Sequence, residues 1–176
     1  MSFTFKNDNS LLLKLIVLLL LQMVITDYVN LGPFIYVNLL PIIILAMPTS
    51  MPVTLLLLSA FVSGCLVDGL AEGIWGLNAF SAVMAAAVKN FFISSLADRE
   101  IVQRGLPLDI RKYGFASILM IIAGMTTVFF LSYCITDMFS HRPFWFILVK
   151  VICSSLISTI ICTLAFEPIF SDRHNR

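Results

Sequence analysis

The sequence predicts an all-α integral membrane protein, folded as one compact bundle of about six transmembrane helices. Of its 176 residues, 60% are hydrophobic and only 12% are charged, whereas a soluble domain averages about 25% charged residues. The mean hydropathy is +1.01, so lipid must act as the solvent. Apolar runs close to the roughly 20 residues of a spanning helix follow one another along the chain, which leaves no stretch for a globular domain outside the membrane.

The first helix is predicted at residues 11–27, after a polar start. A signal peptide is the alternative interpretation of such a segment. However, Lys14 interrupts the apolar run and no small-x-small cleavage site follows it. We therefore expect an uncleaved transmembrane helix, with the Lys14 side chain extending toward the lipid headgroups.

The second apolar run, residues 34–47, is short and contains Pro41. It is open to three interpretations: a kinked helix, a thin spanning helix or a re-entrant element. The remaining helices are predicted at residues 51–67, 77–97, 114–136 and 143–166.

The distribution of basic residues predicts the orientation of the bundle, because short cytoplasmic loops are enriched in Lys and Arg. With six passes, both termini and the hydrophilic loop 98–113 lie on one side of the membrane. That side receives seven basic residues: Lys6, Arg99, Arg104, Arg111, Lys112, Arg173 and Arg176. The other side receives only Arg142. We therefore expect both termini to be cytoplasmic, and prefer six passes to the five that a re-entrant second run would give.

The segment 59–92 organises the chain, since two helices with small faces meet there at a glycine-rich elbow. Small faces allow close helix packing in lipid, either within the bundle or against a partner. We expect the elbow to be exposed on the outer side, with the acids at 68 and 72 accessible and the tryptophan at the interface. The candidate partner-interface residues are Gly64, Asp68, Gly69, Glu72, Gly73, Trp75, Gly76 and Asn78.

Lys89, its neighbour Asn90, and Lys150 are polar residues inside predicted spans. An intramembrane charge is costly, so it is a functional candidate by default. Lys150 is near the end of its helix, so its side chain can extend to the headgroups. Lys89 is farther from a helix end, so we predict that it faces the bundle interior or a partner helix. Lys150 also heads a polar stripe on the last helix. In the predicted topology, the acid at the most similar depth in the membrane is Asp68 for Lys150 and Glu167 for Lys89.

No motif of a hydrolase or nucleotide-binding enzyme occurs, and we expect no catalytic, cofactor-binding or metal-binding residues. His141 and His174 fall on opposite sides of the predicted membrane, and the four cysteines have no CxxC spacing. The mixed-charge loop 98–113 lacks the aromatic residues of a nucleic-acid site, so we expect no nucleic-acid partner.

The segment from Gly64 to Ala79, a helix ending in Asp followed by spaced glycines and a small-residue helix, resembles the rod-shape-determining membrane protein MreD family of bacterial cell elongation. The resemblance implies a non-enzymatic scaffold in the bacterial inner membrane. Its implied partners are a single-pass coiled-coil protein (MreC-like), an actin-like filament protein, and the glycan polymerase and transpeptidase that synthesise peptidoglycan. Glu72 and Lys89 depart from the family pattern.

The fold of that family is similar to the substrate-binding subunits of energy-coupling-factor transporters. This similarity supplies an alternative function, the binding of a vitamin or metabolite for transport. The intramembrane lysines and the serine stripe would then line the binding cavity. A lipid-modifying enzyme is a third interpretation, but no paired acids or histidines support it.

Overall fold

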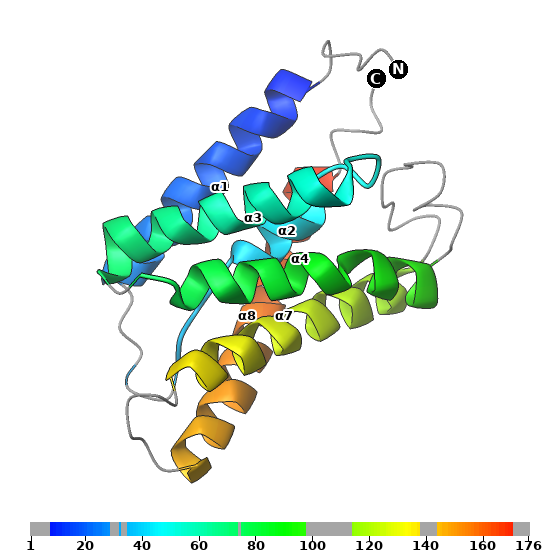
Figure 1. Ribbon diagram of the computed structural model, residues 1–176. Coiled ribbons are helices and arrows are strands. Elements are labelled where there is room, and N and C mark those ends of the chain that lie inside the picture. Colours follow the sequence, from blue (N-terminus) through cyan, green and yellow to red (C-terminus); the bar gives the residue numbers. More distant parts are fainter. Residues whose placement is uncertain are drawn as a thin grey trace.

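The structure is a computed structural model that describes residues 8–28, 32, 35–73, 75–97, 114–137 and 144–170. These residues form six α-helices and one π-helical turn, and none of them lies in a strand (Figure 1). Several predicted features lie outside the described residues: the cytoplasmic loop 98–113, residues 1–7 and 171–176, the two histidines, and all seven basic residues assigned to the inner side. The predicted helical class is thus confirmed.

Five of the helices are long, and their positions agree with the predicted spans. They are α1 (Asp8–Tyr28), α3 (Val53–Val67), α4 (Leu77–Leu96), α7 (Phe115–Asp137) and α8 (Phe144–Phe170). The π-helical turn η1 (Asp68–Glu72) continues α3 without a break. Within the described residues, four segments are long and apolar enough to cross a membrane: Val53–Ala71, Leu77–Leu96, Phe115–Asp137 and Trp145–Phe166.

The second element differs from the prediction of a helix over residues 34–47. Residues 35–39 have no regular secondary structure, and α2 covers only Leu40–Ala46, seven residues. Pro41 lies at the start of this helix, where its fixed φ suits the helix and its missing N–H costs no hydrogen bond. The proline therefore begins a short helix and does not kink a long one.

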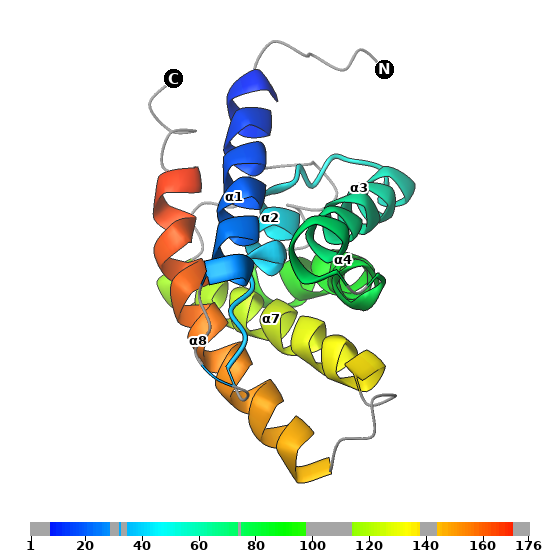
Figure 2. The same cartoon turned by 90° about the vertical axis from the view of Figure 1, so that its left-hand side faces the viewer.

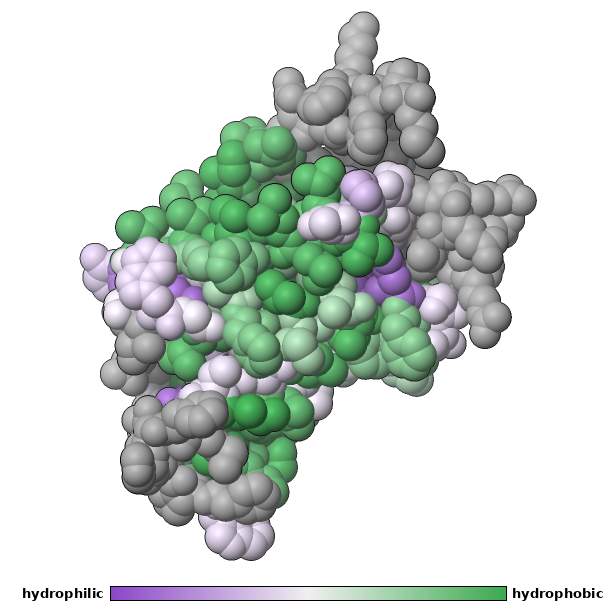
Figure 3. Space-filling view, in the orientation of Figure 1, coloured by the Kyte–Doolittle hydropathy of each residue, from purple (hydrophilic) through white to green (hydrophobic). Residues whose placement is uncertain are grey.

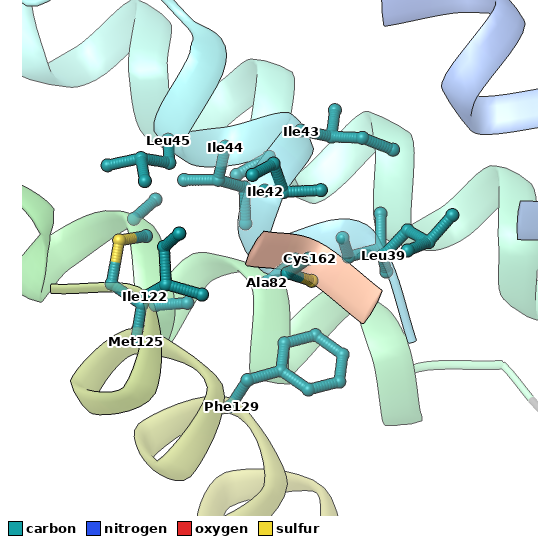
Figure 4. Packing of buried hydrophobic residues seen from close by; sticks show 14 of the residues in the cluster. Leu39, Ile42, Ile43, Ile44, Leu45, Ala82, Ile122, Met125, Phe129 and Cys162 are labelled. Atoms are coloured by element: carbon teal, nitrogen blue, oxygen red, sulfur yellow. The ribbon is translucent and has the colours of Figure 1, made fainter. Parts of the chain in front are cut away.

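The short helix α2 is the centre of the fold. It contacts every other described α-helix, and all seven of its residues are buried. α3, α4 and α7 lie side by side (Figure 1), and in the turned view α2 lies between α3 and α4 on one side and α1 and α8 on the other (Figure 2). The close-up of the core shows the α2 side chains gathered near residues of three helices: Ala82 of α4, Ile122, Met125 and Phe129 of α7, and Cys162 of α8 (Figure 4).

The outer surface of the bundle is apolar. Large side chains such as Leu58 and Phe61 of α3 and Phe91 of α4 are exposed. Figure 3 shows a wide hydrophobic region over these helices, with paler and hydrophilic residues toward its two ends. In water such a surface would drive association, whereas in a bilayer it is the surface that lipid tails cover.

Candidate functional site

The backbone of residues 35–39 obtains hydrogen-bond partners from the side chains of distant helices. The Tyr36 amide donates to Ser154 Oγ at 2.9 Å, and the Asn38 amide donates to Ser158 Oγ at 3.0 Å. Non-helical backbone is tolerated at membrane depth only where protein surrounds it and satisfies its polar groups. The serine stripe of α8 therefore acts as a backbone-binding surface for the broken second element.

Gln22 of α1 supplies the next pair of bonds along the same segment. Its Oε1 accepts from the Leu39 amide at 2.7 Å, and its Nε2 donates to the Val37 carbonyl at 3.4 Å. This side chain thus replaces the neighbouring strand that an extended backbone would otherwise need. Sequence reasoning missed Gln22, although a glutamine in an otherwise apolar helix was the available signal.

Lys89 lies at the other end of the second element. Its side chain is 0% exposed, and its Nζ donates to the carbonyl oxygens of Ile44 at 3.0 Å and Met47 at 2.6 Å. These carbonyls belong to the C-terminal end of α2, where a helix favours a cation. Lys89 was predicted to face the bundle interior or a partner helix, and its burial places it in the interior.

From the sequence we expected Asp68 to be exposed at the elbow. In the structure its side chain is fully buried. Its carboxylate accepts from the backbone amides of Gly76 at 2.9 Å, Asn78 at 2.8 Å and Ala79 at 3.0 Å. The chain folds back at the elbow and brings the unpaired amides at the start of α4 to this carboxylate. Asp68 is therefore the N-terminal cap of α4, supplied from the preceding helical segment.

Asn78 extends this arrangement to the second element. Its Nδ2 donates to Asp68 Oδ1 at 3.1 Å, and its Oδ1 accepts from Asn38 Nδ2 at 2.7 Å. Asn38 in turn accepts from the Leu40 amide at 2.8 Å and so orders the start of α2. A continuous chain of polar contacts thus connects the elbow to the centre of the bundle.

Gly64 is also used within the fold. A Cβ atom added there would lie 2.4 Å from the Cα of Ala79, so the α3 and α4 backbones touch at this point. Three of the predicted interface residues, Gly64, Asp68 and Asn78, are therefore internal packing and capping residues.

Lys150 and Asp137 form an ion pair with an N–O distance of 3.0 Å. The Lys150 Nζ also lies 5.1 Å from the ring centre of Tyr133, which stacks on Tyr36. Asp137, and not Asp68, is thus the acid beside Lys150, because Asp68 is held at α4. The Glu167 side chain, predicted to lie nearest in depth to Lys89, is outside the described residues.

Among the described residues, the exposed part of the elbow includes two large apolar side chains and two glycines. Trp75 is 74% exposed and Leu70 is 68% exposed. A Cβ atom added at Gly69 would lie 2.6 Å from the Trp75 ring, so the indole packs on this glycine. Gly73 and Gly76 are exposed and have φ angles of +71° and +103°, which favour glycine. The Glu72 side chain lies outside the described residues.

Asn90, predicted as a polar candidate beside Lys89, has a buried Oδ1 atom with no hydrogen-bond partner among the described residues. The described residues also contain no group of three His, Cys, Asp or Glu side chains placed to hold a metal ion.

No protein-family model matches the chain, and comparisons with curated proteins and with solved structures found no significant match. The fold and the buried network define a multi-pass helical membrane protein with a broken second element at its centre.

Proposed function

We propose that the chain is a non-enzymatic membrane scaffold of a cell-wall elongation complex, and that the exposed elbow is its docking surface. The observation that carries this proposal is the contrast at the elbow between Asp68, which is buried and accepts hydrogen bonds from three backbone amides, and Trp75, which is 74% exposed. A rigid turn that presents a large aromatic side chain suits an interface, because aromatic residues dominate binding energies.

In this proposal the chain crosses the bacterial inner membrane six times, with both termini in the cytoplasm. The second crossing consists of residues 35–39 and the seven residues of α2. With Leu39 already in the helical conformation, about 3.3 Å per extended residue and about 1.5 Å per helical residue give at most about 25 Å, a little less than the hydrocarbon thickness of about 30 Å. Reporter fusions after Asn9 and after Arg176 test the orientation, and periplasmic reporter activity at either site would refute it.

The partner we propose for the elbow is a single-pass, MreC-like protein whose coiled coil begins just outside the membrane. Such a protein would meet Leu70 and Trp75 with its juxtamembrane residues while its helix packs against the bundle below. Through this partner the scaffold would connect to the actin-like filament and to the glycan polymerase and transpeptidase.

Depletion of the protein in its own rod-shaped cells tests this function. We expect the cells to become round while vitamin uptake stays normal. An uptake defect with normal cell shape would instead favour the alternative, a substrate-binding subunit of a vitamin or metabolite transporter. The broken second element supports that alternative, because transporters often bind substrates where a helix is interrupted.

Crosslinking tests the docking surface itself. In a variant whose four cysteines are replaced by serine, Leu70→Cys and Trp75→Cys should crosslink to the juxtamembrane segment of the partner. Trp145→Cys is the matched control, since Trp145 is 75% exposed but lies on α8. Equal crosslinking from Trp75→Cys and Trp145→Cys would contradict a specific role for the elbow.

A further inference from the structure

The end of α2 concentrates backbone carbonyl oxygens inside the protein. The last carbonyls of a helix form the negative end of the helix dipole. Here the Ile44 oxygen accepts the Met47 amide at 3.2 Å, and a carbonyl oxygen has a second lone pair for a further donor. Ile44 and Met47 are both buried, so bulk water does not compensate this end. The short helix therefore needs a positive or hydrogen-bond-donating group at this point.

Lys89 meets this need from a neighbouring helix. Its Nζ lies 2.6 Å from the Met47 oxygen and 3.0 Å from the Ile44 oxygen. Ala85 and Ala86, one turn earlier on α4, are also buried, and their small side chains leave space for α2 to approach. The amine thus occupies a position made by backbone oxygens of another element.

In membrane transporters, interrupted helices use this same chemistry to hold a cation, since unwound carbonyls and the C-terminal ends of half-helices coordinate it. From this geometry we infer that the carbonyls of Ile44 and Met47 form a monovalent cation site of the ammonium class, and that Lys89 is its permanent occupant. Ca²⁺ and Mg²⁺ take six or more oxygen ligands, and Zn²⁺ in proteins is bound mainly by Cys and His, whereas an ammonium group needs only acceptors at hydrogen-bond distance. Because the cation is covalently part of α4, it cannot exchange with the solution, and it fastens α2 to α4.

Chemical rescue of Lys89→Ala tests this inference independently of cell shape or uptake. The full chain is purified in mild detergent, and its melting temperature is followed with a thiol-reactive dye. Cys134 and Cys162 are buried in the folded protein and report its opening. We expect Lys89→Ala to lower the melting temperature by roughly 10 °C, because the helix end loses its partner.

Ammonium or methylammonium should then raise the melting temperature of Lys89→Ala by several degrees more than tetramethylammonium does at equal ionic strength, because tetramethylammonium has no N–H donor. The wild-type chain, whose site is filled, should show no such difference. Lys150→Ala is the matched control, since Lys150 pairs with a partly exposed carboxylate and its loss should show no selective rescue. Equal responses of Lys89→Ala to both ions would overturn the inference.

Should Lys89→Ala fail to accumulate in membranes, two further variants decide the question. Lys89→Arg keeps a cation, whereas Lys89→Gln keeps a hydrogen-bond donor without charge. The inference requires Lys89→Arg to accumulate several-fold above Lys89→Gln. Accumulation of Lys89→Gln equal to or above that of Lys89→Arg would show that a neutral donor is sufficient and would overturn the cation site.

Discussion

The carboxylate of Asp68 accepts hydrogen bonds from both the backbone amide and the side-chain amide of Asn78, at 2.8 and 3.1 Å. The two residues stand on either side of the elbow, so this contact closes the hairpin between α3 and α4. It also places a buried acid at a helix N-terminus, where the helix dipole favours a negative charge.

The first prediction concerns this cap. Asp68→Asn should lower the free energy of unfolding by about 3 kcal/mol, because an amide offers one acceptor oxygen to donors that two carboxylate oxygens now satisfy. Thermal unfolding in detergent measures the effect. Asp27→Asn is the control, since Asp27 is exposed; equal losses from the two variants would contradict the capping role.

A second prediction separates two glycines that both lie at helix contacts. Gly64→Ala should destabilise the protein by about 2 kcal/mol or more, because the new Cβ would meet the backbone of Ala79 at 2.4 Å. At Gly124 the new Cβ would meet the Phe92 ring at 2.6 Å, and a side chain can turn away. Melting temperatures of Gly64→Ala and Gly124→Ala compare the two, and a larger loss for Gly124→Ala would contradict the assignment.

The third prediction tests the serine stripe of α8. Ser158→Ala should cost about 1–3 kcal/mol, because it leaves the buried amide of Asn38 without its acceptor. Ser155→Ala should cost much less, since the Ser155 hydroxyl bonds only its own helix, at the Ile152 carbonyl. If both variants melt at the wild-type temperature, the stripe does not hold the broken element.

The fourth prediction concerns the Lys150–Asp137 ion pair. The Lys150 side chain is 13% exposed and the Asp137 side chain is 16% exposed, so solvent and salt reach the pair and weaken its attraction. Lys150→Met should therefore cost about 1 kcal/mol or less, far less than Lys89→Met, which removes two buried hydrogen bonds from Lys89 to the carbonyls of Ile44 and Met47. Unfolding of both variants at low and high salt measures the difference, and equal losses would mean that burial does not distinguish the two lysines.

Valine substitutions at Gly73 and Gly76, the exposed glycines of the elbow, are unsuited to test partner binding. Both residues have positive φ angles, which cost a β-branched residue about 1–2 kcal/mol or more. Such variants would strain the elbow whether or not a partner binds, so Trp75 and Leu70 are the better positions.

Composition and hydrophobic run length determined the all-helical membrane class, because a chain with 12% charged residues cannot cover itself with a polar surface. The same runs located the four long apolar helices, since spacing along the chain carries that information. The depth of Lys89 within its apolar segment was enough to predict that it does not face lipid, but not whether it faces the bundle interior or a partner helix.

Only the tertiary structure decided what the second apolar run becomes. Residues 35–39 stay outside regular secondary structure because Ser154 and Ser158, more than a hundred positions later, accept the amide hydrogens of Tyr36 and Asn38. Asp68 is buried for the same kind of reason, since the amides that satisfy it are brought back by the turn at Gly76. A buried polar group in a membrane protein must pair with a partner that folding brings within hydrogen-bond distance. The local sequence does not specify which distant residue that partner is.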